Sequence, residues 1–244
     1  MSDRLNDIIV QGALAVLILF SVATWALLAV KWLEGFRARR QDARFRDALG
    51  KSTGLPSTEL LNKHSGPTAR VALAGVTSWE ANGVGASAAH ISVPREILEL
   101  SLRRQIQKER HTTENGLAVL ASIGTTSPFI GLFGTVFGIL HALTSISSAG
   151  SASLDVVAGP IGEALIATGV GIAVAVPAVL AFNYFVRKLK LQGADLEDFA
   201  NSIVAAALES SLGEHRSRPL SGERTVHQLT EARASGALRE AARI

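Results

Sequence analysis

The sequence predicts an all-α membrane protein with three transmembrane helices and long cytoplasmic helical extensions. Three apolar stretches, with a single acidic residue among them, are each long enough to cross a bilayer, which takes about 20 helical residues. Charged residues are concentrated between and beyond these stretches, whereas a water-soluble domain would carry charged faces along its helices. Basic residues also cluster beside the ends of the apolar stretches, which is typical of membrane topology.

The composition excludes several classes of function. The 244 residues are 48% hydrophobic, the mean hydropathy is +0.28 and the formal net charge is +3. The absence of cysteine rules out disulfides, thiolate metal sites and thiol catalysis. The histidines are scattered without the spacing of metal ligands, so we expect no metal and no cofactor. Because the basic residues are explained by topology, we expect the lipid bilayer as a partner and no nucleic acid.

The first element, residues 1–30, is an external N-terminus followed by a transmembrane helix from Ile8 to Val30. This apolar stretch is too long for the hydrophobic region of a signal peptide, and its basic cluster follows it. The cluster from Lys31 to Arg46 places this end of the helix in the cytoplasm and the N-terminus outside. The polar segment therefore begins on the cytoplasmic side.

Residues 31–114 form a predicted cytoplasmic segment of helices. One helix is expected from Leu60 to Trp79, and a loop from Ala81 to Ser92, where Gly, Ser and Ala accumulate. A further helix begins near Pro94 and carries apolar residues at a four-residue interval, namely Leu98, Leu102 and Ile106. Because no helix-breaking residue precedes Asn115, we expect this helix to continue directly into the membrane.

The second transmembrane helix is predicted over residues 115–143. Pro128 lies within it, and we predict a kink there, since the carbonyl that it frees can be met by hydroxyls or by neighbouring helices. Small residues follow every third or fourth position and include Gly131, Thr135 and Gly138. Small faces let helices pack closely in lipid. This stripe is therefore either a tight packing seam or the lining of a narrow polar path.

The remaining elements complete the topology. Residues 144–156 are polar and free of Lys and Arg, which fits an external loop. The third transmembrane helix, 157–186, returns to the cytoplasm, where a basic cluster follows it. An amphipathic cytoplasmic helix is expected over 187–212, and a mobile C-terminal tail over 213–244. The C-terminus is therefore predicted to be cytoplasmic.

The third helix carries a second stripe of small residues, namely Ala164, Thr168, Gly171, Ala175 and Ala178. Pro177 predicts a second kink. Glu163 precedes the stripe and lies about 100° around the helix from Ala164. Counted from the outer ends of the two helices, Thr135, Thr168 and Glu163 fall in the same outer half of the membrane. The two stripes thus bring an acid and two hydroxyls to similar depths.

Glu163 requires a partner or a function, because a charged side chain at bilayer depth costs about 2.5–3.5 kcal/mol. A desolvated carboxyl group with nearby hydroxyls is the minimum for a proton-accepting site. Alternatively, Glu163 stabilises the N-terminus of its helix, and the hydroxyls of Thr135 and Thr168 bond to carbonyls of their own helices. The residues alone leave open whether Glu163 faces a pore or a neighbouring subunit.

Two stretches resemble the MotA/TolQ/ExbB proton-channel family, and within it the ExbB proteins. They read SIGTTSPFIGLFGTVFGIL over 122–140 and VVAGPIGEALIATGVGIAVAVPAV over 156–179, and SVATWALLAVKWLEGF over 21–36 is a weaker match. The resemblance implies a homo-oligomer, a pentamer, whose second and third helices surround a pore. It also implies an ExbD-like partner inside the pore, with one span that bears an Asp, and a TonB-like protein docked outside.

By this resemblance the chain is a proton-channel subunit of the bacterial inner membrane that couples the proton motive force to active transport across the outer membrane. Glu163, Thr135 and Thr168 would then lie on the proton pathway. The chain departs from the family pattern in the order of Gly159 and Pro160, and in Phe137, where Trp is common.

Other functions stay open. TolQ-like subunits, which maintain the envelope, share the same motifs, and a non-conducting membrane scaffold would also carry packing stripes. An intramembrane enzyme is not expected, because no Ser and His pair or Asp pair lies at membrane depth.

Overall fold

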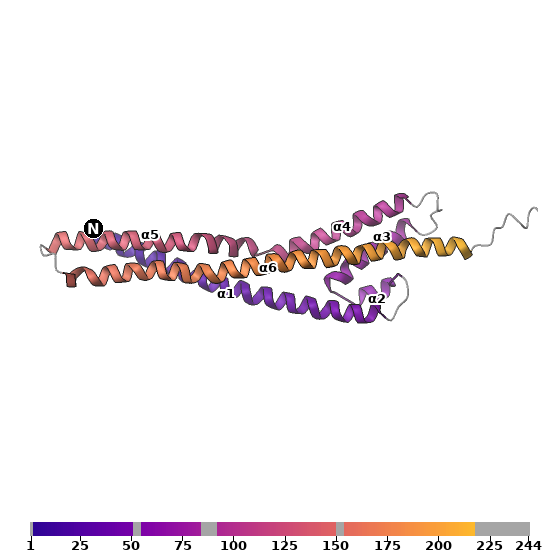
Figure 1. Ribbon diagram of the computed structural model, residues 1–244, viewed down its shortest axis with the longest axis horizontal. Helices are drawn as coiled ribbons and strands as arrows, with labels where there is room; N and C mark the ends of the chain where they lie inside the picture. The colour runs from indigo at the N-terminus through magenta and orange to yellow at the C-terminus, as the bar shows by residue number, and fades with distance from the viewer. Residues whose placement is uncertain (1, 51–54, 84–91, 150–153, 218–244) are drawn as a thin grey trace, which may run out of the picture.

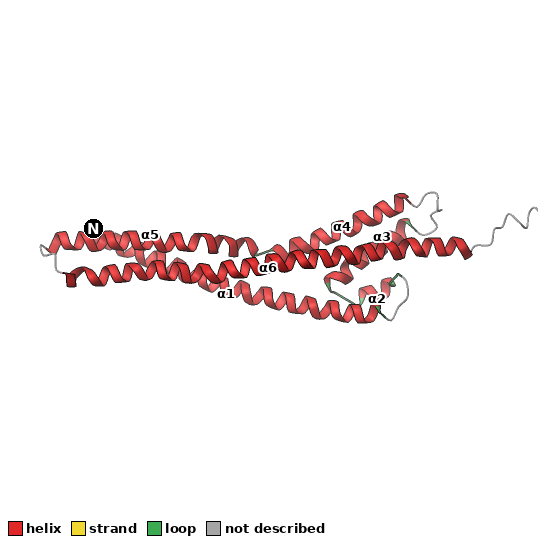
Figure 2. Ribbon diagram, in the orientation of Figure 1, coloured by secondary structure: helices red, strands yellow, loops and turns green. Residues whose placement is uncertain are grey.

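The computed structural model describes residues 2–50, 55–83, 92–149 and 154–217. Every regular element within these ranges is an α-helix (Figure 2). In chain order they are α1 (Ser2–Leu49), α2 (Thr58–Asn62), α3 (Pro67–Asn82), α4 (Ser92–Glu114), α5 (Leu117–Ala149) and α6 (Leu154–Ser217). They form a long rod in which α6 runs along most of the length (Figure 1).

The three predicted membrane-spanning helices are present, because parts of α1, α5 and α6 are long and apolar enough to cross a bilayer. Their outward faces expose large apolar side chains, including Leu19, Val22, Phe129, Phe133, Leu165 and Leu180. An apolar surface of this extent fits lipid better than water. The all-α fold class with three spans is therefore confirmed.

The two halves of the rod differ in polarity. The N-terminal end of α1, the C-terminal end of α5 and the N-terminal end of α6 lie at the same end, and α2, α3 and α4 gather in the other half (Figure 1). The apolar parts of α1, α5 and α6 thus form one half, which we call the membrane half. The charged segments form the other, which we call the polar half.

One hydrophobic core holds the polar half together. It is built from α1, α2, α3, α4 and α6, and its largest members are Phe45, Leu61, Val71, Val76, Trp79, Leu98, Leu102, Ile106, Leu196 and Ile203. Apolar residues spaced three or four apart share one helical face. The four-residue pattern of α4 and the amphipathic pattern in the last part of α6 are therefore both confirmed by burial.

Two polar contacts add to this core. Arg70 of α3 donates to Glu109 of α4 through both Nε (2.7 Å) and Nη2 (2.5 Å), and Glu109 is buried. Hydrogen bonding to Glu109 raises the pKa of the Arg70 guanidinium above its ordinary value. Asp42 of α1 accepts from the backbone N–H of Thr68 (3.1 Å) at the start of α3, where helix amides lack intrahelical partners. These contacts tie α3 to its neighbours.

The expectation that the helix of residues 94–114 continues directly into the membrane is wrong. α4 ends at Glu114 and α5 begins at Leu117, after Gly116 with φ of +84°. This left-handed conformation is open to glycine and is common just after a helix. Lys31 Nζ donates to the carbonyl oxygen of Thr113 (3.1 Å), which lies in the last turn of α4. α1 therefore supports the turn between the two halves.

Several predicted boundaries also differ. The single helix expected over residues 60–79 is two helices, because Gly66 and Pro67 separate α2 from α3, and proline is favoured in a first helical turn. Helix α5 extends to Ala149 and α6 begins at Leu154, so much of the expected external loop 144–156 is helical. Helix α6 continues to Ser217, past the expected start of the tail at residue 213. Residues 84–91 and 218–244 lie outside the described part.

The two prolines with predicted kinks lie inside uninterrupted helices. Helix α5 continues through Pro128, and α6 continues through Pro177. The hydroxyl of Ser127 bonds to the carbonyl oxygen of Ile123 (2.6 Å), and that of Thr125 bonds to Ala121 (3.0 Å). The carbonyl that Pro128 leaves without its i−4 partner is that of Gly124, and of these two hydroxyls only that of Ser127 bonds to an adjacent carbonyl, that of Ile123.

Candidate functional site: a hydroxyl pair between two membrane helices

Helices α5 and α6 pack through their glycines. A Cβ atom on Gly131 would lie 2.6 Å from the carbonyl oxygen of Ala167, and one on Gly138 would lie 2.6 Å from the Cβ of Ala164. A Cβ on Gly171 would lie 2.7 Å from the carbonyl oxygen of Ser127. Such approach requires residues without side chains, as in close helix pairs in lipid. Within one chain, the two small-residue stripes therefore form a packing seam, and Ala175 is buried along it.

Two hydroxyls meet within this seam. Thr135 Oγ1 of α5 is hydrogen-bonded to Thr168 Oγ1 of α6. It also lies 3.1 Å from each of two carbonyl oxygens, that of Gly131 on its own helix and that of Ala164 on α6. A hydroxyl carries one proton and two lone pairs, so Thr135 donates to one carbonyl or to Thr168 at a time. The two hydroxyls can thus exchange donor and acceptor roles, and they do so among the apolar residues of the membrane half.

Glu163 lies apart from this pair. It is exposed on α6, although the next residue, Ala164, is 1% exposed and faces the seam. Five positions separate it from Thr168, or about 7.5 Å along the helix axis at 1.5 Å per residue. In the described part of the chain no hydrogen bond joins Glu163 to either threonine. The structure brings Thr135 and Thr168 together and leaves Glu163 on the outward surface, so the three-residue proton pathway stays a prediction.

Two further buried hydroxyls belong to residues of the membrane half that the sequence did not single out as sites. Ser127 is fully buried in α5, and Thr24 of α1 is 1% exposed and donates to the carbonyl oxygen of Phe20 (2.8 Å). In the sequence, Ser127 precedes Gly131 by four residues and so shares the small-residue face of α5. Both hydroxyls bond to a carbonyl of their own helix, one of the ways in which a hydroxyl is satisfied in a membrane helix. Thr24 could have been noticed in the sequence because it is a hydroxyl residue within the first apolar stretch.

Comparison with known proteins shows that Thr135, Thr168 and Glu163 lie in the part of the chain that matches a known family. The sequence profile of the MotA/TolQ/ExbB proton channel family matches residues 64–198, which include both threonines and Glu163. The biopolymer transport protein ExbB of Neisseria meningitidis serogroup A is 35% identical over 202 residues, which cover 81% of this chain and 91% of that protein.

Two further relatives show the spread of the similarity. The biopolymer transport protein ExbB of Xanthomonas campestris pv. campestris is 35% identical over 78% of each chain. The Tol-Pal system protein TolQ of Haemophilus influenzae is 33% identical over 72% of this chain and 79% of its own. From the profile match and these identities, the chain belongs to the MotA/TolQ/ExbB proton channel family.

Proposed function

We propose that this chain is the proton-channel subunit of an energy-transducing complex in the bacterial inner membrane. It would assemble as a homopentamer, enclose an ExbD-like single-span protein with a transmembrane Asp, and engage a TonB-like protein. The complex would couple the proton motive force to active transport across the outer membrane. Family membership and the similarity to ExbB proteins support this proposal.

The observation that carries the proposal is that α6, which bears the exposed acid Glu163, also forms a hydroxyl pair with α5, of which Thr135 is buried and Thr168 partly buried. An isolated chain would turn Glu163 towards lipid, at a cost of about 2.5–3.5 kcal/mol. Assembly around a hydrated pore, or against a polar partner, removes that penalty. Thr168 then provides a hydroxyl within two helical turns of the acid, and this hydroxyl is hydrogen-bonded to that of Thr135 on the side that packs α5 against α6.

The proposed orientation places the N-terminus in the periplasm and the C-terminus in the cytoplasm. The basic residues of the polar half favour its position in the cytoplasm. The N-terminal end of α1, the C-terminal end of α5 and the N-terminal end of α6 share the opposite end of the rod (Figure 1). These three ends would then be periplasmic.

The test measures proton flux into liposomes that contain the complete complex. Glu163→Gln keeps the shape of the side chain and removes its charge, so we expect flux to fall at least tenfold while the complex still assembles. Normal flux through normally assembled Glu163→Gln protein would refute the channel proposal. If the variant complex does not assemble, Glu163→Asp, which keeps the carboxylate, is expected to restore both assembly and flux.

The hydroxyl pair is tested by replacing each threonine with valine, which has nearly the same shape. We expect Thr135→Val and Thr168→Val to lower flux. The matched control is Thr24→Val, because the hydroxyl of Thr24 is also buried but bonds only within α1. Equal flux in all three variants would make Thr135 and Thr168 packing residues, as in a scaffold.

A second candidate is a TolQ-like role in envelope maintenance, which the similarity to TolQ of Haemophilus influenzae favours. The two roles predict different defects in cells that lack this protein. Loss of energy-dependent uptake with an intact envelope supports the first role. Leakage of periplasmic contents with normal uptake supports the second.

A further inference from the structure

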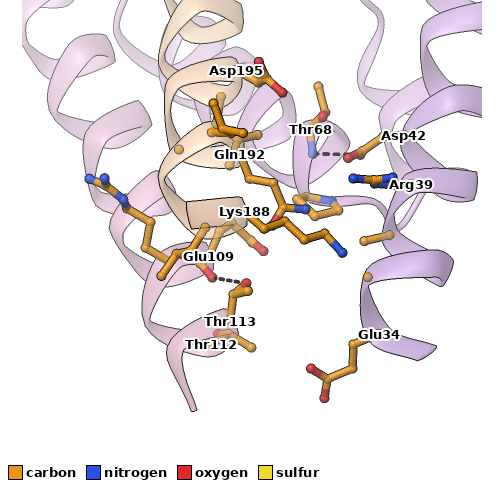
Figure 3. A pocket seen from close by; sticks show the side chains of 18 of the residues that line it. Glu34, Arg39, Asp42, Thr68, Glu109, Thr112, Thr113, Lys188, Gln192 and Asp195 are labelled. Atoms are coloured by element: carbon orange, nitrogen blue, oxygen red, sulfur yellow. Dashed lines mark hydrogen bonds between the residues drawn. The ribbon is translucent and has the colours of Figure 1, made fainter. Parts of the chain in front are cut away.

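A cavity lined by both charged and apolar residues lies where the two halves of the rod meet. Its volume is about 760 Å³, and it opens between α1, α4 and α6, with the start of α3 on one side (Figure 3). Leu117, Phe185 and Leu189 line it towards the membrane half, and they belong to an apolar cluster there. The cavity therefore joins an apolar wall to a charged wall at the level where the apolar parts of α1 and α6 end.

Most of the acids in the cavity wall already have partners. Glu34 accepts from Lys31 Nζ (2.9 Å), and Glu109 accepts from Arg70. Asp42 accepts from the backbone N–H of Thr68. Asp195 lies two helical turns from Lys188 along α6, about 10.5 Å at 1.5 Å per residue, and it is drawn at the opposite end of the view from Glu34 (Figure 3).

Lys188 and Arg39 are among the wall cations for which the described residues provide no such partner. Lys188 extends from α6 across the hollow towards α1 (Figure 3), and Arg39 of α1 is close enough to act on it by charge repulsion. Among the residues that the structure describes, no carboxylate lies within salt-bridge distance of either side chain. A partly desolvated cation next to a like charge is unfavourable, so an anion between the two would be stabilised.

Gly35 makes room for this arrangement. A Cβ atom at this position would lie 2.2 Å from Lys188 Nζ, so the ammonium group occupies the space that any other residue would fill. The missing side chain thus lets the ammonium reach the surface of α1, on the same helix as Arg39. The position of the charge depends on the glycine.

We propose that this cavity binds a phosphate group between Lys188 and Arg39. The group belongs either to the headgroup of an anionic phospholipid or to a soluble phosphate compound of the cytoplasm. Arginine and lysine are the residues that bind phosphate oxygens, and basic pockets between membrane helices on the cytoplasmic side suit lipid headgroups. Trp32 and Leu33, exposed on α1 just before Gly35, suit the interface that such a headgroup would occupy.

The test counts lipids bound to the purified full-length protein by native mass spectrometry. The probes are phosphatidylglycerol and phosphatidylcholine with identical acyl chains, each with and without inorganic phosphate as competitor. We expect the wild type to prefer phosphatidylglycerol, and Lys188→Gln or Arg39→Gln each to reduce that preference about fivefold. The matched controls are Lys190→Gln and Arg44→Gln, which remove exposed cations of α6 and α1 that do not line the cavity.

Equal losses in the control variants would mean general attraction between charges, and would overturn the proposal. Gly35→Ala provides a variant that keeps every charge and displaces only the ammonium of Lys188. It should reduce the preference as well, and an unchanged preference in this variant would also contradict the site.

Competition by inorganic phosphate distinguishes a lipid headgroup from a soluble phosphate compound as the source of the bound group. A preference that inorganic phosphate does not change supports a lipid headgroup. Displacement of the lipid by phosphate that depends on Lys188 and Arg39 supports a soluble compound. Absence of both phosphatidylglycerol preference and phosphate binding overturns the proposal.

Discussion

Replacing Gly131 with alanine tests the seam between α5 and α6 directly. The new Cβ would lie 2.6 Å from the carbonyl oxygen of Ala167, 3.1 Å from the Cα of Thr168 and 3.2 Å from the Cα of Gly171. All three neighbours are backbone atoms, so no side chain can rotate away. To bring the shortest of these contacts to 3.4 Å, an ordinary van der Waals distance, the helices must separate locally by 3.4 − 2.6, or about 0.8 Å.

This separation has two opposing consequences for stability. Overpacking of a tight contact destabilises by about 1–3 kcal/mol, whereas alanine is favoured over glycine inside a helix by about 0.5–1 kcal/mol. We therefore expect a net loss of about 1 kcal/mol, the middle of the difference between these ranges. For a chain of this size that corresponds to a fall in Tm of about 2–4 °C. The hydrogen bond from Thr135 to the carbonyl oxygen of Ala164, now 3.1 Å, would also lengthen.

The measurement is thermal unfolding of the purified protein in detergent, followed by circular dichroism. The matched control is Gly12→Ala in the membrane part of α1, because nothing lies within 4 Å of a Cβ at that position. Gly12→Ala should leave Tm unchanged or raise it. If Gly131→Ala is as stable as Gly12→Ala, then α5 and α6 do not pack at this register, and the hydroxyl pair loses its structural basis.

Three further substitutions test contacts of the polar half and of the turn below it, each by the change in the free energy of unfolding. Arg70→Ala leaves the buried carboxylate of Glu109 without its bidentate partner and should destabilise by about 1–3 kcal/mol; full stability would show that the pair does not form. Asp42→Ala removes the acceptor for the N–H of Thr68 and should lose about 1 kcal/mol, whereas Asp42→Asn keeps an acceptor oxygen and should lose little; equal losses would contradict this cap. Gly116→Ala forces a side chain into the left-handed region and should lose about 1–2 kcal/mol, and an unchanged stability would argue for a continuous helix there.

Features that depend on local pattern could be predicted from the sequence. Hydropathy identified the three spans, because a bilayer requires a long uncharged helix wherever the chain crosses it. The spacing of Leu98, Leu102 and Ile106 identified the buried face of α4, because a helix repeats every 3.6 residues whatever it packs against. The turn at Gly116 was missed, because a single glycine is tolerated inside many helices and only packing against Leu27 and Lys31 selects the break.

The sequence by itself determined which residues could form the site, and only the tertiary structure decided which of them meet. Stripes of small residues on two helices predict close packing, but the register between the helices depends on contacts between segments far apart in the chain. That register sets Gly131 against Ala167, joins Thr135 to Thr168, and leaves Glu163 on the outside. The cavity at Lys188 arises in the same way, because Gly35 and Arg39 reach it only when α1 lies against α6.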